Sequence, residues 1–147
     1  MQQFNSSNFY LICDNLSRKD RELRRIIKQY GYPPMWTRPA TFQTLILTIL
    51  EQQGSLASAD AAFKKLKEKI GYVTPSKLLA LTDEEMRACY FTRQKTGYAR
   101  GLAEAVQTRK ITLKKLTHLT DDEVRNKLIK LKGIGHWTVD VYLMHAL

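Results

Sequence analysis

The sequence predicts an all-α fold, and two features of the chain point to it. Helix-start and helix-stop signals recur along the chain, whereas no segment alternates apolar and polar residues as a half-buried strand does. One segment is apolar on all sides, as expected of a helix at the centre of a bundle. The length of 147 residues and the 44% hydrophobic content suit one packed domain, or two small lobes that share a core. We therefore expect about eight helices joined by short links.

The N-terminal region is expected to hold helices followed by a rigid, proline-rich connector. Ser17 is placed as the N-cap of a helix over residues 18–30, and Gly31 follows its last residue. A connector with three prolines comes next, and proline fixes the backbone and cannot continue a helix. The predicted organisation is an N-terminal region over residues 1–40 and a second domain over residues 41–147.

The second domain begins with the apolar segment over residues 41–53, which we expect to be a buried central helix. Ser55 can cap the next helix, which should end before Gly71. Thr74 and Pro75 then form a helix start, with threonine as N-cap and proline at the first helical position.

An internal repeat follows. The segments 77–87 and 115–125 match at a constant offset of 38, and each contains a Thr-Asp-x-Glu capping box. Continuing that offset pairs Gly97 with Gly135, and we expect each glycine to open a new helix. The interpretation is two successive helix-hairpin-helix units packed as a pseudo-twofold pair; the alternative is a chance likeness between two capped amphipathic helices.

The charge balance indicates a polyanionic partner. Twenty-four Lys and Arg residues against fourteen Asp and Glu residues give a net charge of +10. The alternative is a basic face that is merely solvated. The basic residues are spread along the chain and no apolar run is long enough to span a bilayer, so we expect no membrane partner. Cys13 and Cys89 are too few for a disulfide framework and are interpreted as reduced thiols of an intracellular protein.

The segment 130–138 is the strongest candidate binding site, a hairpin that could hold a phosphate. Gly133 and Gly135 let the backbone approach a ligand closely, and the helix that begins near His136 directs unpaired N–H groups and a positive dipole end at it. Ile134 can fill the gap between the two flanking helices. A Gly-x-Gly alone is often a simple turn, but here it lies between two helices of a basic chain. The predicted phosphate-binding residues are Lys130, Lys132, Gly133, Ile134, Gly135, His136 and Thr138.

A monovalent cation is the one cofactor that the hairpin suggests. Backbone carbonyl groups of Lys132, Gly133 and Gly135 could hold such an ion and bridge it to a phosphate. No other cofactor is expected.

Three stretches together resemble a known family. Residues 49–55, 119–124 and 131–138 are similar, in the family's order, to the helix-hairpin-helix (HhH-GPD) superfamily of DNA base-excision glycosylases. The chain most resembles the branch that removes alkylated bases, the 3-methyladenine DNA glycosylase II type. The resemblance implies an HhH-GPD helical bundle, a monomer that acts in DNA repair, double-stranded DNA with a damaged base as partner, and hydrolysis of the N-glycosidic bond of alkylated purines.

The resemblance also implies roles for single residues. Trp137 falls at the mouth of the base pocket, where strand-cutting relatives carry a nucleophilic lysine, which favours a monofunctional enzyme. Gln52 matches a family glutamine at the end of the buried helix, and Gln53 falls where relatives insert a wedge into the gap left by the flipped base. Because aromatic faces attract cationic alkylated purines, Trp36 and Tyr142 join Trp137 and Gln52 as base-pocket candidates. Core packing is the alternative for each aromatic residue, and simple exposure at a helix end is the alternative for Gln53.

The family's catalytic aspartate lies in the loop after the helix that follows the hairpin. This sequence reaches Leu147 within that helix, so we assign no catalytic residue and expect a chain that is incomplete at its C-terminus and excises no base by itself. Asp140 is interpreted as an acid on the helix surface. A non-catalytic helix-hairpin-helix DNA-binding module and an all-α protein–protein module remain as alternative functions.

Overall fold

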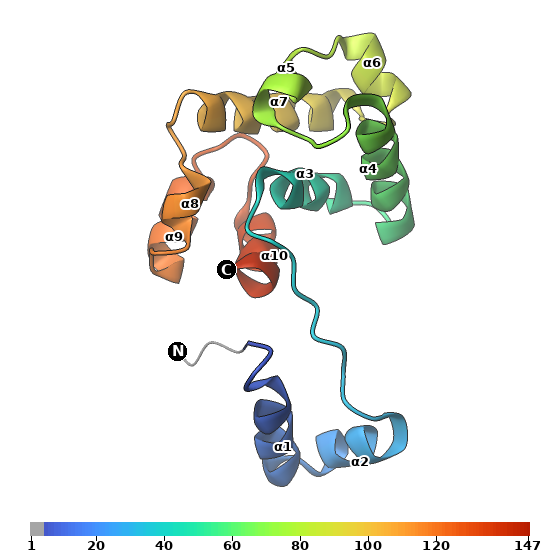
Figure 1. Ribbon diagram of the computed structural model, residues 1–147, viewed down its shortest axis with the longest axis vertical. Coiled ribbons are helices and arrows are strands. Elements are labelled where there is room, and N and C mark those ends of the chain that lie inside the picture. The colour runs from blue at the N-terminus through green and yellow to red at the C-terminus, as the bar shows by residue number, and fades with distance from the viewer. Residues whose placement is uncertain (1–4) are drawn as a thin grey trace. The chain divides into compact units, whose positions relative to one another are not determined.

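The computed structural model describes residues 5–147, and within that range it contains ten α-helices and no strand (Figure 1). The predicted all-α class is therefore confirmed. The chain divides between Thr37 and Arg38 into two compact units, three residues before the boundary expected from the sequence.

The N-terminal unit contains α1 (Phe9–Lys19) and α2 (Arg21–Tyr30). The predicted cap was wrong, because Asp20 rather than Ser17 begins α2. The Asp20 carboxylate accepts hydrogen bonds from two amides of the first turn, at 2.8 and 3.0 Å. Ser17 lies inside α1, a helix whose bounds were not predicted from the sequence, and its hydroxyl donates to a carbonyl one turn earlier. Gly31 follows α2 as expected.

The C-terminal unit is built around α3 (Phe42–Glu51), of which eight of ten residues are buried. The helices α4 (Leu56–Ile70), α7 (Arg93–Gln107) and α10 (His136–Ala146) pack against it. Thr41 caps α3 and Ser55 caps α4, both through their hydroxyl groups. The prediction of a buried central helix is confirmed, and its C-terminal end is where the candidate site lies.

Four shorter helices complete this unit: α5 (Pro75–Leu79), α6 (Asp83–Ala88), α8 (Leu113–Leu116) and α9 (Asp121–Leu128). α5 and α6 pack on α7, and α9 packs on α10. Both predicted capping boxes are formed, at the starts of α6 and α9. The structure has more helices than the eight or so predicted. One of the additional helices is α1, which precedes the first helix placed from the sequence, and another is α8, which has only four residues.

The predicted register of the repeat was wrong beyond the capping boxes. The boxes are 38 residues apart, but the helices that follow the hairpins begin at Arg93 and His136, which are 43 residues apart. Gly97 therefore lies inside α7 and opens no helix. The second copy of the repeat has five more residues than the first copy between its capping box and its next helix. A constant offset therefore cannot align both the boxes and the helices.

The two hairpins share a backbone conformation when they are aligned from the helix starts. The first matched position is left-handed in both, with φ of 63° and 83°. The second is a buried apolar residue, 3% exposed in both, and the third is the extended N-cap residue of α7 or α10. The matched pairs are Tyr90 with Gly133, Phe91 with Ile134, and Thr92 with Gly135.

Candidate nucleic-acid interface

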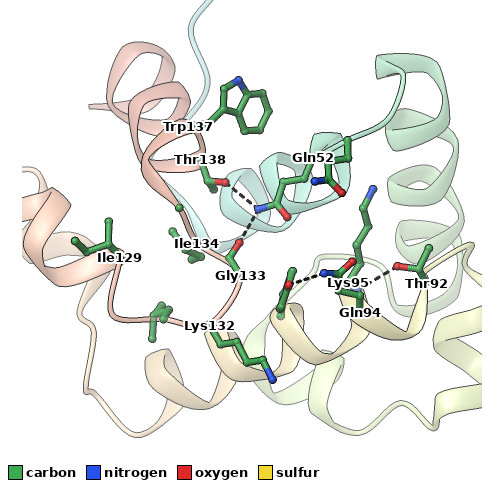
Figure 2. Close-up of a pocket in the computed structure, with 14 residues that line it drawn as sticks. Gln52, Thr92, Gln94, Lys95, Ile129, Lys132, Gly133, Ile134, Trp137 and Thr138 are labelled. Carbon is green, nitrogen blue, oxygen red and sulfur yellow. Dashed lines mark hydrogen bonds between the residues drawn. The ribbon is translucent and has the colours of Figure 1, made fainter.

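A pocket of about 850 Å³ lies between the end of α3, the start of α7 and the hairpin before α10 (Figure 2). Segments more than 80 residues apart in sequence meet there, as the 81-residue separation of Gln52 and Gly133 shows. The predicted site residues that line it are Gln52, Gln53, Lys132, Gly133, Ile134, Gly135, Trp137 and Thr138.

The hairpin presents an open helix N-terminus. Gly135 is the N-cap residue of α10, and it provides no side-chain hydrogen bond to the first turn. Within residues 5–147, the backbone N–H groups of His136, Trp137 and Thr138 make no hydrogen bond. Uncapped amides at a helix start, together with the positive end of the helix dipole, form a general anion-binding arrangement.

The side chains of the remaining hairpin residues are either buried in the core or exposed to solvent. Ile134 is 3% exposed and belongs to the hydrophobic core, so it fills the space between the helices as predicted. Lys130, Lys132 and His136 are exposed, and of these three Lys132 lines the pocket. The hairpin is thus fixed from beneath by an apolar residue and has cationic or hydrogen-bonding side chains on its solvent side.

Gln52 ties the hairpin to the central helix. Its side-chain amide donates to the carbonyl oxygen of Gly133 at 2.7 Å and to Oγ1 of Thr138 at 2.8 Å (Figure 2). Both amide hydrogens are used in these bonds. Thr138 is 2% exposed, so the structure corrects its predicted role: the hydroxyl faces Gln52 in the interior, and only the backbone of Thr138 belongs to the open helix start.

Gln53 lies on a tight turn at the edge of the pocket. Gln52 has φ −59° and ψ 130°, and Gln53 has φ 48°, values that resemble the two central positions of a type II turn. The side chain of Gln53 is exposed. Its role as a wedge stays a prediction, and the turn gives it an outward position suited to that role.

The three aromatic candidates lie in different environments. Trp137 is 53% exposed and lines the pocket. Tyr142 is fully buried in the core away from the pocket, and burial raises the pKa of its hydroxyl to about 12. Trp36 belongs to the N-terminal unit and is 70% exposed, whereas every residue that lines the pocket comes from the C-terminal unit. The structure therefore removes Tyr142 from the predicted base pocket, because its ring is buried in the core, whereas the role of Trp36 stays a prediction.

Asp140 is paired on the surface. Its Oδ1 accepts from Nη2 of Arg125 at 2.7 Å and from Nε at 3.1 Å, which joins α10 to α9. The interpretation of Asp140 as a surface acid agrees with this ion pair, and the ion pair raises the pKa of Arg125.

Residues 46–147 match the family described as the HhH-GPD superfamily of base excision DNA repair proteins. The chain belongs to this superfamily. It is 30% identical over 140 residues to DNA-3-methyladenine glycosylase 1 of Schizosaccharomyces pombe, a match that covers 90% of this chain and 61% of that relative. The chain thus spans about three fifths of the relative's length.

Two solved structures extend the comparison. The 3-methyladenine DNA glycosylase Mag1 of Schizosaccharomyces pombe, in complex with abasic DNA, is 30% identical with a TM-score of 0.83, covering 92% of this chain and 69% of that one. The DNA-3-methyladenine glycosidase of Bacillus halodurans is 29% identical with a TM-score of 0.74, covering 88% of this chain and 60% of that one. Both are more than 25% identical to this HhH-GPD chain, and both share its fold.

Sequence reasoning missed one side of the HhH-GPD pocket. The pocket is also lined by four residues from the start of α7, namely Thr92, Gln94, Lys95 and Tyr98. Because α7 was expected to open at Gly97, the preceding residues had no helix on which to be placed. One signal could have located this helix start: Thr92 is a good N-cap residue and directly follows Phe91, an aromatic residue.

No group of three or more His, Cys, Asp or Glu side chains in residues 5–147 could hold a metal ion. The predicted monovalent cation would instead use carbonyl oxygens. Those of Gly133 and Gly135 already accept from Gln52 and from the amide of Val139, and each has a second lone pair. The cation therefore stays a prediction. Cys13 and Cys89 are buried free thiols.

In residues 5–147, no helix combines the length and the apolar character needed to cross a membrane.

Proposed function

We propose that this protein is a monofunctional DNA glycosylase that hydrolyses the N-glycosidic bond of alkylated purines in double-stranded DNA, acting as a monomer inside the cell. The observation that carries the proposal is the position of the open hairpin next to the pocket. A group that can hold a backbone phosphate, an exposed tryptophan and an outward-facing turn surround one cavity.

The proposed mechanism divides the work among these parts. The hairpin amides and the side chains of Lys130 and Lys132 hold the DNA backbone without reading its sequence. Gln53 fills the gap that the damaged base leaves in the stack. The exposed face of Trp137 attracts a cationic alkylated purine, because the ring quadrupole favours positive charge. Support for the 3-methyladenine class comes from the names of the relatives with 30% and 29% identity.

Release of 3-methyladenine from methylated duplex DNA tests the proposal directly. The assay uses the protein encoded by the complete open reading frame, and the released base is separated by chromatography. We expect release of 3-methyladenine with no cutting of the strand, because a tryptophan takes the place of the lyase lysine. Release of no alkylated base would contradict the glycosylase proposal, and strand cutting would contradict the monofunctional one.

A non-catalytic DNA-binding module is the second candidate. One observation favours it, namely that the open helix start at Gly135 can hold a backbone phosphate whether or not any base is released. Binding to duplex DNA together with no release of any base would favour this candidate.

We also propose the monovalent cation at the carbonyls of Lys132, Gly133 and Gly135. Replacing potassium by tetramethylammonium at constant ionic strength should then weaken DNA binding. Equal affinities in the two salts would contradict a bound cation.

A further inference from the structure

The turn after α3 holds a glutamine in an unfavourable backbone conformation. Gln53 has φ 48°, a left-handed value that glycine or asparagine adopts more readily than glutamine. Such a conformation persists only where the surrounding structure holds it. Gln53 itself is exposed, so the restraint must act on its neighbours in the turn.

The side chain of Lys95 extends from α7 to this turn. Lys95 is the third residue of α7, and its Nζ donates to the carbonyl oxygen of Leu50 at 2.6 Å. The same Nζ lies 3.9 Å from the position that a Cβ on Gly54 would occupy, and Figure 2 shows the side chain extending from α7 toward the turn. The ammonium group therefore binds the chain just before Gln52 and Gln53, through Leu50, and lies close to Gly54, which follows them.

The chemistry of this contact suits a helix end. The carbonyl group of Leu50, in the last turn of α3, accepts from no backbone amide of residues 5–147 beyond the helix, and a cation at a helix C-terminus also interacts favourably with the helix dipole. Lys95 has no carboxylate within ion-pair distance among residues 5–147, and partial burial lowers the pKa of its ammonium group. The ammonium group of Lys95 is thus partly buried, and its hydrogen-bond partner is a backbone carbonyl of α3.

We propose that Lys95 is a positioning residue that holds the turn after α3 in its left-handed form and so directs Gln53 outward. The inference rests on the proposed function, in which Gln53 is the wedge that enters the DNA. It assigns to Lys95 an effect on the recognition of a missing or flipped base, and no part in the grip on the phosphate backbone. The two duties are then carried by separate residues of one pocket.

The test compares two duplexes of the same sequence, one intact and one with a tetrahydrofuran abasic site. Fluorescence anisotropy gives the affinity of the full chain for each. We expect Lys95→Met to reduce the preference for the abasic duplex as much as Gln53→Ala does, by roughly tenfold, with affinity for the intact duplex within about twofold. Lys95→Arg should restore the preference, and Lys64→Met on α4 is the matched control.

A double-mutant cycle separates positioning from a general structural role. If Lys95 acts through Gln53, Lys95→Met adds nothing to Gln53→Ala. The Gln53→Asn background gives a second check, because asparagine adopts the left-handed conformation readily and should need Lys95 less. Urea unfolding confirms that each variant folds, and Lys95→Gln replaces Lys95→Met if the latter does not.

Three results would overturn the inference. Equal weakening on both duplexes with a lower salt dependence would make Lys95 a direct phosphate contact. Additive effects of Lys95→Met and Gln53→Ala would make the lysine independent of the turn. A wild-type chain that binds both duplexes equally would remove the wedge itself, which is a failure of the proposed function and is distinct from a failure of Lys95 alone.

Discussion

The two hairpins of the C-terminal unit have the same backbone conformation, but one leads into a capped helix start and the other into an open one. At the start of α7, the hydroxyl of Thr92 accepts from the amide of Lys95 at 3.2 Å, so a side chain occupies the helix start. At the start of α10, Gly135 leaves the corresponding amides open. Tyr90 places a ring that is 61% exposed at the matched position of Gly133, which has no side chain. One hairpin is closed by its own residues, and the other is open to a ligand.

The two helices nevertheless share a structural task. The third residue of each contacts the end of α3: Lys95 donates to the carbonyl of Leu50, and Thr138 accepts from Gln52. α7, from the first copy of the repeat, and α10, from the second copy, therefore both contact the C-terminal end of α3. The comparison indicates that the first copy provides support, whereas the second both supports α3 and presents the binding hairpin.

The largest effect is expected from Gly133→Ala. A Cβ at Gly133 would lie 2.0 Å from the ring of Tyr98, and the residue has φ 83°. Overlap and backbone strain together should lower the free energy of unfolding by about 3 kcal/mol and disrupt DNA binding. Gly71→Ala is the matched control, with φ 69° and only the flexible end of Lys77 nearby, and should cost about 1 kcal/mol. Equal losses in urea unfolding would show that Tyr98 does not constrain the open hairpin.

Gln52→Met tests the tie between α3 and the hairpin. The carbonyl of Gly133 loses its hydrogen-bond donor, so we expect a loss of about 2 kcal/mol in unfolding free energy. The neighbouring Gln53→Ala removes an exposed side chain and should change stability by less than about 0.5 kcal/mol. Similar stabilities for the two variants would contradict the assigned role of Gln52.

Gly135→Thr gives the open hairpin the residue of the closed one. The backbone of Gly135 has φ −96°, which any residue adopts, and no atom lies within 4 Å of an added Cβ. We expect stability to change by less than about 0.5 kcal/mol, because threonine and glycine are similar N-cap residues. Affinity for duplex DNA should fall by roughly tenfold, since a hydroxyl then occupies the helix start. Unchanged affinity would mean that open amides are not the difference between the hairpins.

The smallest effect concerns the cores beneath the two hairpins. Tyr142 of α10 matches Ala99 of α7 when the helix starts are aligned, and both are fully buried. Burial raises the pKa of Tyr142 to about 12 from 10.0, so the folded state keeps a proton that the unfolded state loses. Stability should therefore fall as pH rises above 10, by about 1 kcal/mol at pH 11. Tyr142→Phe should remove this fall relative to wild type, and an unchanged pH profile would contradict it.

Local signals in the sequence predicted much of this fold. The capping boxes, the Thr74–Pro75 helix start and the apolar α3 each depend on residues close in sequence, and each was predicted correctly. The register beyond the boxes was not, because five extra residues in the second unit interrupt the offset that relates the two copies.

The candidate site was only partly predictable for the same reason. Gly133, Ile134 and Gly135 form a local motif, and their hairpin was found. The contacts of Gln52, Lys95 and Tyr98 join segments far apart in sequence, and no local pattern encodes them. Tyr142 was misplaced because an aromatic residue on an apolar helix gives no sign of whether its ring faces a core or a pocket.

The salt dependence of DNA affinity tests the central claim most directly, namely that the open hairpin holds a backbone phosphate. Anisotropy at several salt concentrations gives the slope of log affinity against log salt for wild type, Lys132→Gln, Gly135→Thr and the control Lys64→Gln on α4. The slope is negative, and each lost phosphate contact reduces its magnitude by about 0.9. We expect that decrease in both hairpin variants on every sequence, with the control unchanged. Slopes equal to wild type in both hairpin variants would contradict the account.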